Sequence, residues 1–145
     1  MRNQYVIKYA KNTQFVIGVS DKISGASVVL LDTKATPDNS FYLWDLQDDN
    51  TIALNSASAR LVIDCGSLTS GSYLKLSAYN SGKVTPTQQW YYDETFYYNL
   101  NNSDFVIDNQ YRGESSNNPI WLYPFNGSVA QQWLLAPYAG RRNLE

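Results

Sequence analysis

Short hydrophobic or alternating runs recur along the chain, separated by clusters of Asn, Asp, Ser and Gly. Alternation with a period of two is typical of β-strands, and the separating residues tolerate positive φ or bond their own backbone, as turns require. No stretch carries the 3.6-residue period of a long amphipathic helix. The pattern predicts twelve short strands, at residues 5–8, 15–19, 28–31, 42–46, 52–54, 61–64, 73–76, 89–92, 96–98, 105–108, 120–123 and 132–135.

The strand pattern occurs three times. Apolar triplets begin at Phe15, Leu61 and Phe105, and a tryptophan follows each of them in step, at positions 44, 90 and 133. We therefore predict repeats over residues 1–47, 48–93 and 94–140, each of which buries its apolar face only against the other two. The same offsets align Val6 with Ile52 and Phe96, Val28 with Leu74 and Asn118, Leu30 with Leu76 and Ile120, and Gly25 with Gly71.

Three four-stranded units without helices fit a closed threefold barrel better than a three-bladed propeller, because propellers normally have at least four blades. We predict an all-β protein with the β-trefoil fold and pseudo-threefold symmetry. A length of 145 residues suits one domain over residues 1–145, since domains cluster around 100–150 residues. The first and last strands of each repeat should form the barrel and the middle two a capping hairpin. Trp44, Trp90 and Trp133 should lie in the core.

Composition limits the chemistry. The chain has no histidine, which excludes Ser-His-Asp and Cys-His nucleophiles and His-ligated zinc. Its net charge of −2 provides no basic surface for nucleic acid. Cys65 is the only cysteine, so no intrachain disulfide can form, and we expect a small buried residue with an unreactive thiol. We expect no enzyme activity, no cofactor and no membrane insertion; without a signal peptide, the location should be cytoplasmic or leaderless-secreted.

The ends of the repeats resemble the ricin-type lectin family, whose β-trefoil repeats end in Gln-x-Trp. Gln88-Gln89-Trp90 and Gln131-Gln132-Trp133 carry this motif, whereas Trp44 keeps only the tryptophan. Residues 122–133 also resemble the sugar-binding stretch in the last repeat of the ricin B chain, with the Tyr-Pro, the Gly and the Gln-x-Trp at matching spacing. The resemblance implies a non-catalytic lectin for galactose- or N-acetylgalactosamine-terminated glycans, with shallow sites that act multivalently.

A galactose-like sugar has one apolar ring face and a rim of hydroxyls, so it needs an aromatic ring and a carboxylate or amide. Asp64 in the second repeat and Asp108 in the third stand where the family carries its sugar-binding Asp. We expect both at the surface, contributing little to the core. By resemblance, Gln88 and Gln131 brace these carboxylates. The other predicted sugar-binding residues are Tyr79 and Asn80 in the second repeat, and Trp121, Tyr123 and Asn126 in the third.

The phase of Trp121 supports a role at the surface. It lies between Ile120 and Leu122 in sequence, so on a strand it faces away from the side that they share, together with Tyr123. An exposed tryptophan is typical of a binding surface.

The first repeat departs from the site pattern, because Gly18 replaces the aspartate and Thr33 aligns with Tyr79 and Tyr123. We expect that repeat to lack a site of this type. The family also carries an Asn before the Gln of Gln-x-Trp, and here Thr87 and Ala130 stand in its place. Either the predicted turn amides, Asn80 and Asn126, supply the missing group, or the specificity is altered or sugar binding is lost.

Other interpretations of the same residues remain open. The two aspartates could cap turns, and Tyr79 and Tyr123 could cover the barrel rim. A β-trefoil that binds protein through its loops, such as a protease inhibitor, is the alternative function, although the long loops 33–40 and 110–118 carry no recognisable inhibitory sequence. For a lectin, multivalency would come from two sites on one chain or from a homodimer.

Overall fold

The computed structural model describes residues 4–57, 60–79 and 83–138, which contain twelve strands and four short 3-10 helices. Every predicted strand overlaps one of the twelve, so the strand predictions are confirmed. The first repeat holds β1 (Gln4–Tyr9), β2 (Phe15–Val19), β3 (Val28–Asp32), η1 (Asn39–Phe41) and β4 (Trp44–Leu46). The second holds β5 (Ile52–Leu54), β6 (Leu61–Asp64), β7 (Lys75–Ala78), η2 (Pro86–Gln88) and β8 (Trp90–Asp93). The third holds β9 (Phe96–Asn99), β10 (Asn102–Asn109), η3 (Gln110–Arg112), β11 (Asn118–Pro124), η4 (Val129–Gln131) and β12 (Trp133–Pro137).

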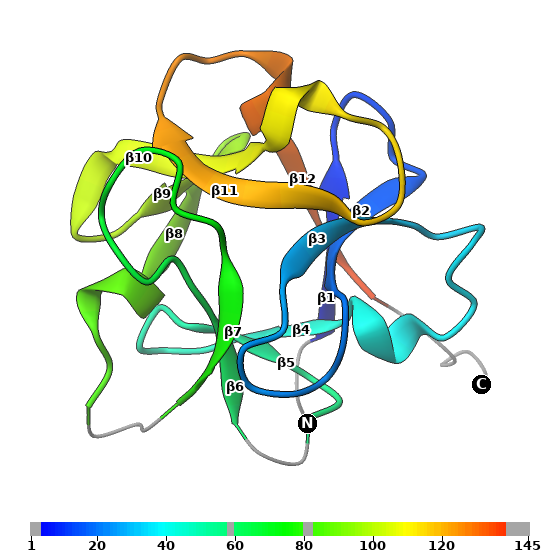
Figure 1. Ribbon diagram of the computed structural model, residues 1–145, viewed down its shortest axis with the longest axis horizontal. Helices are drawn as coiled ribbons and strands as arrows, with labels where there is room; N and C mark the ends of the chain where they lie inside the picture. The colour runs from blue at the N-terminus through cyan, green and yellow to red at the C-terminus, as the bar shows by residue number, and fades with distance from the viewer. Residues whose placement is uncertain (1–3, 58–59, 80–82, 139–145) are drawn as a thin grey trace.

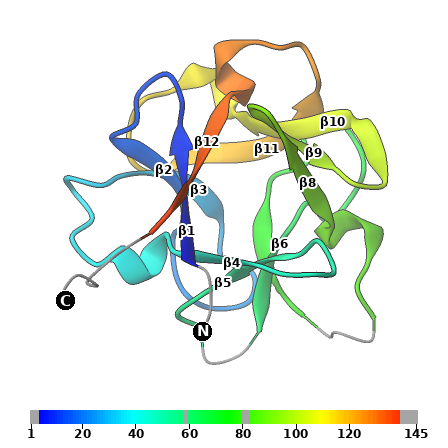
Figure 2. The same ribbon diagram turned by 180° about the vertical axis from the view of Figure 1, so that it is seen from behind.

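The first and last strands of each repeat form a closed ring, which faces the viewer in Figure 2. β1 pairs with β4 and β12, β4 pairs with β5, and β8 pairs with β9. Two backbone hydrogen bonds of 2.8 Å complete the ring, from the Trp90 N–H to the Asn50 carbonyl and from the Trp133 N–H to the Thr95 carbonyl. This six-stranded barrel is the wall of the predicted β-trefoil.

Three hairpins, β2–β3, β6–β7 and β10–β11, cap the barrel and bond to one another in a cycle. The backbone N–H groups of Gly25, Gly71 and Asn117 each donate to a carbonyl of a neighbouring hairpin, at 2.6–2.7 Å. All three donors have positive φ, a conformation that glycine adopts freely and asparagine tolerates. In Figure 1, β3, β7 and β11 surround the centre of this cap. The backbone therefore carries the threefold symmetry even where the residues differ.

The core lies between barrel and cap. Trp44, Trp90 and Trp133 are 0%, 2% and 0% exposed, which confirms their predicted place. Each indole N–H donates to the carbonyl of the isoleucine in the apolar triplet of its own repeat, so the buried polar atom is paired. The three distances are 2.9, 3.1 and 3.0 Å, to Ile17, Ile63 and Ile107 respectively.

Strand register corrects the predicted alignment of the third hairpin. Asp108 pairs with Trp121, 13 residues further on, whereas Asp64 pairs with Lys75, 11 residues further on. The loop between β10 and β11 is thus two residues longer than its counterpart. As a result, Leu122 corresponds to Leu30 and Leu76, in place of the predicted Ile120. In the same way, Ile120 replaces Asn118 as the equivalent of Val28 and Leu74.

The first strands of the three repeats also differ from the predicted alignment of Val6, Ile52 and Phe96. Two of these three residues, Val6 and Phe96, are one position away from the true equivalents of Ile52. The core contains Ile7, Ile52 and Tyr97 at equivalent places. Val6 and Phe96 point to the opposite side of their strands, because successive side chains alternate between the faces of a strand. Val6 joins a separate apolar cluster, and Phe96 joins an aromatic cluster on the outer surface.

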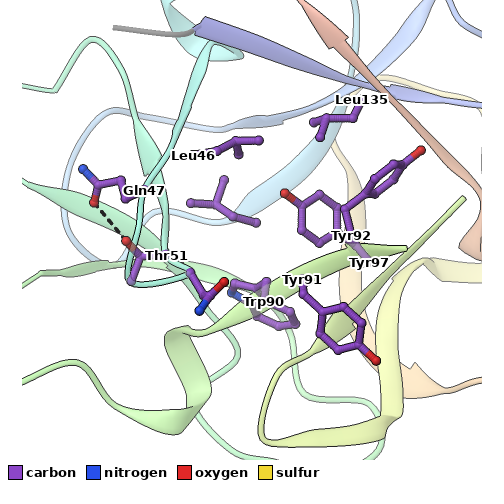
Figure 3. Close-up of a pocket in the computed structure, with 10 residues that line it drawn as sticks. Leu46, Gln47, Thr51, Trp90, Tyr91, Tyr92, Tyr97 and Leu135 are labelled. Atoms are coloured by element: carbon purple, nitrogen blue, oxygen red, sulfur yellow. Dashed lines mark hydrogen bonds between the residues drawn. The ribbon is translucent and has the colours of Figure 1, made fainter. Parts of the chain in front are cut away.

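A cavity of about 190 Å³ lies beside the barrel strands. Leu46, Tyr92 and Leu135, each two residues after a core tryptophan, line it together with Tyr97 (Figure 3). The hydroxyl of Tyr92 donates to the carbonyl of Trp133 at 2.6 Å and so closes part of the wall. None of the predicted sugar-binding residues that the structure describes lines this cavity. Within the described residues, no helix has the length and hydrophobicity needed to cross a membrane.

Candidate functional site

The third repeat brings a carboxylate, an amide and an indole together. Asp108 stands near the end of β10, Trp121 lies opposite it in β11, and Gln131 ends η4. One carboxylate oxygen of Asp108 accepts the indole N–H of Trp121 at 2.8 Å, and the other accepts the Gln131 amide at 3.0 Å. Each oxygen keeps a second lone pair for a further donor.

Gln131 is fully buried and holds this arrangement in place. Its amide nitrogen donates to Asp108 and to the Pro124 carbonyl, the latter at 2.9 Å. Its amide oxygen accepts the backbone N–H groups of Asn126 and Gly127 at 2.8 and 3.2 Å. One side chain thus joins the carboxylate to the loop after β11, which is the bracing role that the resemblance implies for Gln131.

Asp108 is only 5% exposed, so the expectation of a surface carboxylate is wrong for this residue. Burial raises its pKa, because a low-dielectric surrounding disfavours the charged form. The hydrogen bonds from Gln131 and Trp121 and the positive charge of Arg112 act in the opposite direction. Removing Asp108 therefore affects folding as well as any ligand.

Aromatic rings surround Trp121 on the outer face of the hairpin. Ile120 and Leu122 are fully buried, while Trp121 and Tyr123 lie on the opposite side, as their phase predicts. The rings of Trp121 and Tyr123 stack, with centroids 5.1 Å apart and planes 11° apart. Tyr73 packs against Trp121 at 5.8 Å, and Tyr111 meets it edge-on at 5.5 Å. Trp121 and Tyr123 are therefore only partly exposed, whereas Tyr73 and Tyr111 are exposed.

Sequence reasoning missed Tyr73 and Tyr111, which are 49% and 82% exposed. Tyr73 belongs to the second repeat and reaches the third through a backbone bridge to Trp121. Its hydroxyl accepts the side-chain amide of Gln110 at 2.7 Å. No pattern within one repeat indicates a contact between two repeats. Tyr111 has φ of 55°, an unusual value for a tyrosine. No pattern in the sequence predicts this backbone conformation.

Asn126 occupies the loop beside this cluster. Its side-chain oxygen accepts the Ser128 N–H at 2.9 Å, which fixes the turn. Among the described residues its amide nitrogen has no hydrogen-bond partner, so that donor is available. Ala130, at the place of the family's Asn, is buried and has no polar side-chain atom.

The second repeat contains the same carboxylate–amide pair in a more open setting. Asp64 is half-buried and accepts the Gly66 N–H at 2.7 Å on one oxygen and the Gln88 amide at 3.1 Å on the other. Its cross-strand neighbour is Lys75, at the place of Trp121. Asp64 thus caps a turn, as the alternative interpretation holds, and also faces the predicted glutamine.

Tyr79 is engaged with residues outside this pair. Its hydroxyl donates to Asp49, and the Arg60 guanidinium lies 5.0 Å from its ring centroid. These contacts occupy the hydroxyl and one ring face. Asn80, the other predicted residue of this repeat, lies outside the described residues.

Backbone pairing also corrects the predicted equivalence of Thr33, Tyr79 and Tyr123. The N–H groups of Thr33, Tyr79 and Phe125 donate to the opposite strand at 3.0, 2.8 and 2.8 Å, so Phe125 is the third member of that set. Tyr123 corresponds to Ser77, because they pair with Val106 and Val62 respectively. The second repeat therefore has a serine where the third has its stacked tyrosine.

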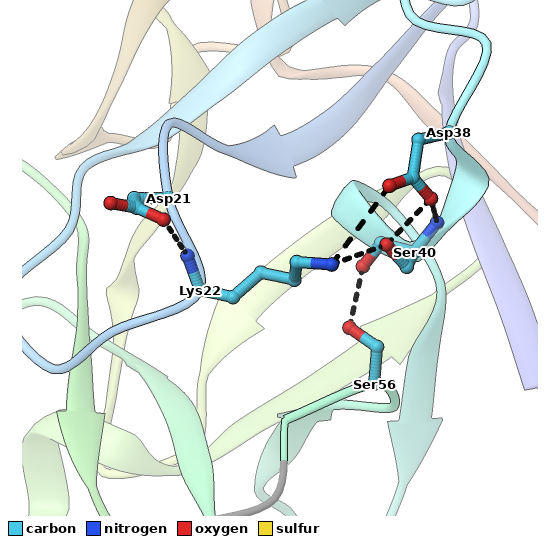
Figure 4. Close-up of polar contacts among 5 residues, drawn as sticks. All are labelled: Asp21, Lys22, Asp38, Ser40 and Ser56. Carbon is cyan, nitrogen blue, oxygen red and sulfur yellow. Dashed lines mark hydrogen bonds and ion pairs between the residues drawn. The ribbon is translucent and has the colours of Figure 1, made fainter.

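The first repeat has no room for a carboxylate at the corresponding place. A Cβ on Gly18 would lie 2.4 Å from a Leu31 methyl group and 2.7 Å from the Phe41 carbonyl. The Lys22 ammonium lies 4.7 Å from the Phe41 ring centroid. It also donates to the Ser40 hydroxyl at 2.6 Å (Figure 4). Protein atoms thus fill the position, consistent with the expected lack of a site.

Two further side-chain predictions have structural outcomes. Cys65 is 2% exposed, and burial raises its thiol pKa to about 12, with the neighbouring Asp64 charge adding to the shift. The predicted burial of Cys65 is confirmed, and the raised pKa agrees with the expectation of an unreactive thiol. In the part of the chain that the structure describes, no three Cys, His, Asp or Glu side chains converge as metal ligands would.

Comparison with known proteins gives a family and a fold. The model of the ricin-type beta-trefoil lectin domain matches residues 4–136. The C-half of an earthworm R-type lectin, solved in complex with GalNAc, superposes with a TM-score of 0.78 at 16% identity, over 94% of this chain and 99% of that chain. A designed threefold-symmetric protein, ThreeFoil, superposes with a TM-score of 0.74 at 19% identity, over 92% and 97%. No curated protein sequence matches the chain.

Proposed function

The chain belongs to the ricin-type beta-trefoil lectin family, and from this premise we propose that it binds galactose- or N-acetylgalactosamine-terminated glycans through its third repeat, without catalysing a reaction. The single observation that carries the proposal is the buried pair of Asp108 and Gln131 beside the stacked rings of Trp121 and Tyr123. It combines a fixed acceptor with an aromatic face, which are the two groups that a galactose-like sugar requires.

In this proposal, the free lone pairs of Asp108 accept hydroxyl groups of the sugar, and Gln131 keeps the carboxylate oriented. Tyr123 stacks on the apolar face of the sugar ring. Trp121 supports Tyr123 by stacking on it and fixes Asp108 by donating its indole N–H. Asn126 supplies the amide donor that Ala130 lacks.

The second repeat is proposed as a weaker site. Asp64 and Gln88 form the polar pair there, and Tyr79 and Asn80 stay predicted sugar contacts of this repeat. Ser77 provides no aromatic face at the place of Tyr123, and Arg60 covers one face of Tyr79. We therefore assign most of the affinity for a single sugar to the third repeat.

Galactose specificity is proposed from two sources. The GalNAc complex of the earthworm lectin concerns a protein of the same fold at 16% identity. The second source is the arrangement of one carboxylate beside one ring face in this chain. Presentation of two sites on one chain, or on a homodimer, would raise the avidity of such weak sites.

Glycan-array binding followed by titration calorimetry with free galactose tests the proposal. The wild-type protein should bind galactose-terminated glycans, and free galactose should compete. Tyr123→Ala should weaken galactose binding by about 1–2 kcal/mol, because it removes the stacking face. Leu134→Ala, at an exposed leucine on β12, is the matched control and should bind like wild type. Failure of the array to show any glycan, together with inhibition of a protease panel, would favour the inhibitor alternative.

A further inference from the structure

Tyrosines also stand on the outer face of the strands next to the proposed sugar site. Tyr91 pairs with Tyr98, Tyr98 pairs with Val106, and Val106 pairs with Tyr123. The four residues thus stand side by side across β8, β9, β10 and β11. Because neighbouring strands lie about 4.8 Å apart, Tyr98 and Tyr123 are separated by about 10 Å across Val106. Asp108 lies two residues further along β10, on the same face as Val106.

Ring contacts join these tyrosines to two phenylalanines. Tyr91 and Tyr98 stack at 5.1 Å with planes 16° apart, and Tyr98 and Phe125 stack at 5.8 Å with planes 27° apart. Phe96 meets the edge of Phe125 at 4.9 Å. We name these four residues, Tyr91, Phe96, Tyr98 and Phe125, the aromatic row. Phe125 directly precedes Asn126, so the row and the proposed sugar site share a loop.

The other two repeats show that the fold does not require this row. The positions equivalent to Tyr98 are Lys8 and Ala53, which pair with Val16 and Val62 in the same way that Tyr98 pairs with Val106. The equivalents of Tyr91 are Asp45 and Leu134, each of which follows a core tryptophan directly. A barrel with the same backbone therefore forms over charged, small and aliphatic residues at these places, so the fold does not require the aromatic side chains of Tyr91 and Tyr98.

The row is accessible and has polar groups at its edges. Phe125 is 45% exposed, and the other three rings are half-buried. In the described part of the chain, the hydroxyls of Tyr91 and Tyr98 have no hydrogen-bond partner. Burial raises the pKa of Tyr98, and the charges of Asp93 at the exposed end of β8 and Glu94 in the following turn raise it further. The exposed Phe125 ring offers an apolar contact, and the free tyrosine hydroxyls and nearby carboxylates suit the hydroxyl rims of a sugar chain.

We infer that the aromatic row is an extended glycan subsite, in which the exposed Phe125 ring and the hydroxyls of Tyr91 and Tyr98 contact the internal sugars of an oligosaccharide whose terminal sugar occupies the Asp108 site. This inference rests on the proposed function. It identifies the ligand class as extended oligosaccharides. The strand-to-strand spacing of the row is comparable to the breadth of one sugar ring, so successive sugars can meet successive strands.

Titration calorimetry with three probes that all end in galactose tests the inference: galactose, N-acetyllactosamine and the tetrasaccharide made of two N-acetyllactosamine units. Wild-type protein should bind the tetrasaccharide about tenfold or more tightly than galactose, because added sugars gain added ring contacts. Tyr98→Ala and Phe125→Ala should each lower tetrasaccharide affinity by about fivefold to tenfold, while galactose affinity changes by less than about twofold.

Two variants guard against misfolding and nonspecific effects. Tyr98→Ala installs the residue that the second repeat carries at the equivalent place, so the backbone accepts it. Leu134→Ala removes a similar exposed apolar side chain at the equivalent of Tyr91 and should leave the affinity for all three probes unchanged. Near-ultraviolet circular dichroism of each variant verifies the native packing.

The outcomes separate the subsite from the proposed function. Equal affinity for all three probes, or unchanged tetrasaccharide binding in both Tyr98→Ala and Phe125→Ala, would overturn the subsite while leaving the terminal-sugar site intact. No binding of any probe by wild-type protein would overturn both. A wild-type dimer that dissociates in Phe125→Ala, with sugar affinities unaltered, would assign the row to self-association instead.

Discussion

Asp108 receives one hydrogen bond on each carboxylate oxygen, from Trp121 and from the fully buried Gln131. Asp108→Ala leaves both donors without this acceptor in a dry site, so the free energy of unfolding should fall by about 1–3 kcal/mol. Sugar binding at the third repeat should be lost as well. Chemical denaturation and calorimetry measure the two effects.

Asp64→Ala is the matched comparison, because Asp64 is half-buried and its partners can bond to water instead. Its cost in stability should be about 1 kcal/mol or less. An Asp108→Ala variant that is as stable as wild type would contradict the structural role assigned to the buried carboxylate.

Trp121 is the one tryptophan of the four that is not buried, so it should report on ligand binding. Its fluorescence should shift during titration with a galactoside, while the three core tryptophans should stay unchanged. Trp121→Phe keeps an aromatic ring beside Tyr123 but deletes the N–H that bonds Asp108. This variant should lose the fluorescence shift and about 1 kcal/mol of stability. A shift of equal size in Trp121→Phe would place the responding tryptophan elsewhere.

At the scale of the elements, the hairpins show which glycines the fold depends on. Gly18→Ala would place a Cβ 2.4 Å from Leu31 and 2.7 Å from the backbone carbonyl of Phe41, so β2 and η1 would have to move apart. Thermal or chemical unfolding should show a loss of about 1–3 kcal/mol.

Gly25→Asn provides the control for this prediction. The equivalent position in the third repeat is Asn117, which has φ of 73° and makes the same backbone hydrogen bond to the next hairpin. Apart from its two chain neighbours, no described residue comes within 4 Å of a Cβ placed on Gly25. The substitution should therefore change the free energy of unfolding by less than about 1 kcal/mol. A larger loss of stability in Gly25→Asn than in Gly18→Ala would contradict the conclusion that the fold depends more on Gly18 than on Gly25.

For the whole molecule, agglutination of cells depends on how many sites act together. The third repeat has the complete set of carboxylate, amide and stacked ring, and the second has only part of it. Asp64→Ala should reduce haemagglutination by more than half while the affinity for free galactose stays within about twofold of wild type, because cross-linking needs two sites and the tighter one persists. Asp108→Ala should greatly reduce both.

Sedimentation analysis completes the agglutination experiment. A monomeric protein that agglutinates must use two sites of one chain, whereas a dimer can cross-link through two copies of the third-repeat site. Unchanged haemagglutination in the Asp64→Ala, Asp108→Ala double variant would exclude both proposed sites as its cause.

The sequence by itself determined the elements and the repeat. Alternating or continuous apolar runs identified all twelve strands, and the spacing of the triplets and tryptophans identified three units with a shared core. These features depend on short segments of chain, since side-chain direction on a strand and the turn preferences of residues act locally. The same locality explains why the phase of Trp121 was predictable, whereas the contact of Gln131 with Asp108 was implied by the resemblance to the lectin family.

Tertiary structure decided the features that depend on register and on contacts between repeats. Two extra residues in the β10–β11 loop moved Phe125, not Tyr123, to the place of Tyr79. Contacts with Asp49 and Arg60 engaged Tyr79, and Tyr73 reached the third repeat from the second. A strand shows which way its side chains point, but which partner they meet is set by how distant segments align, and a small change in loop length alters that alignment without altering the strand pattern.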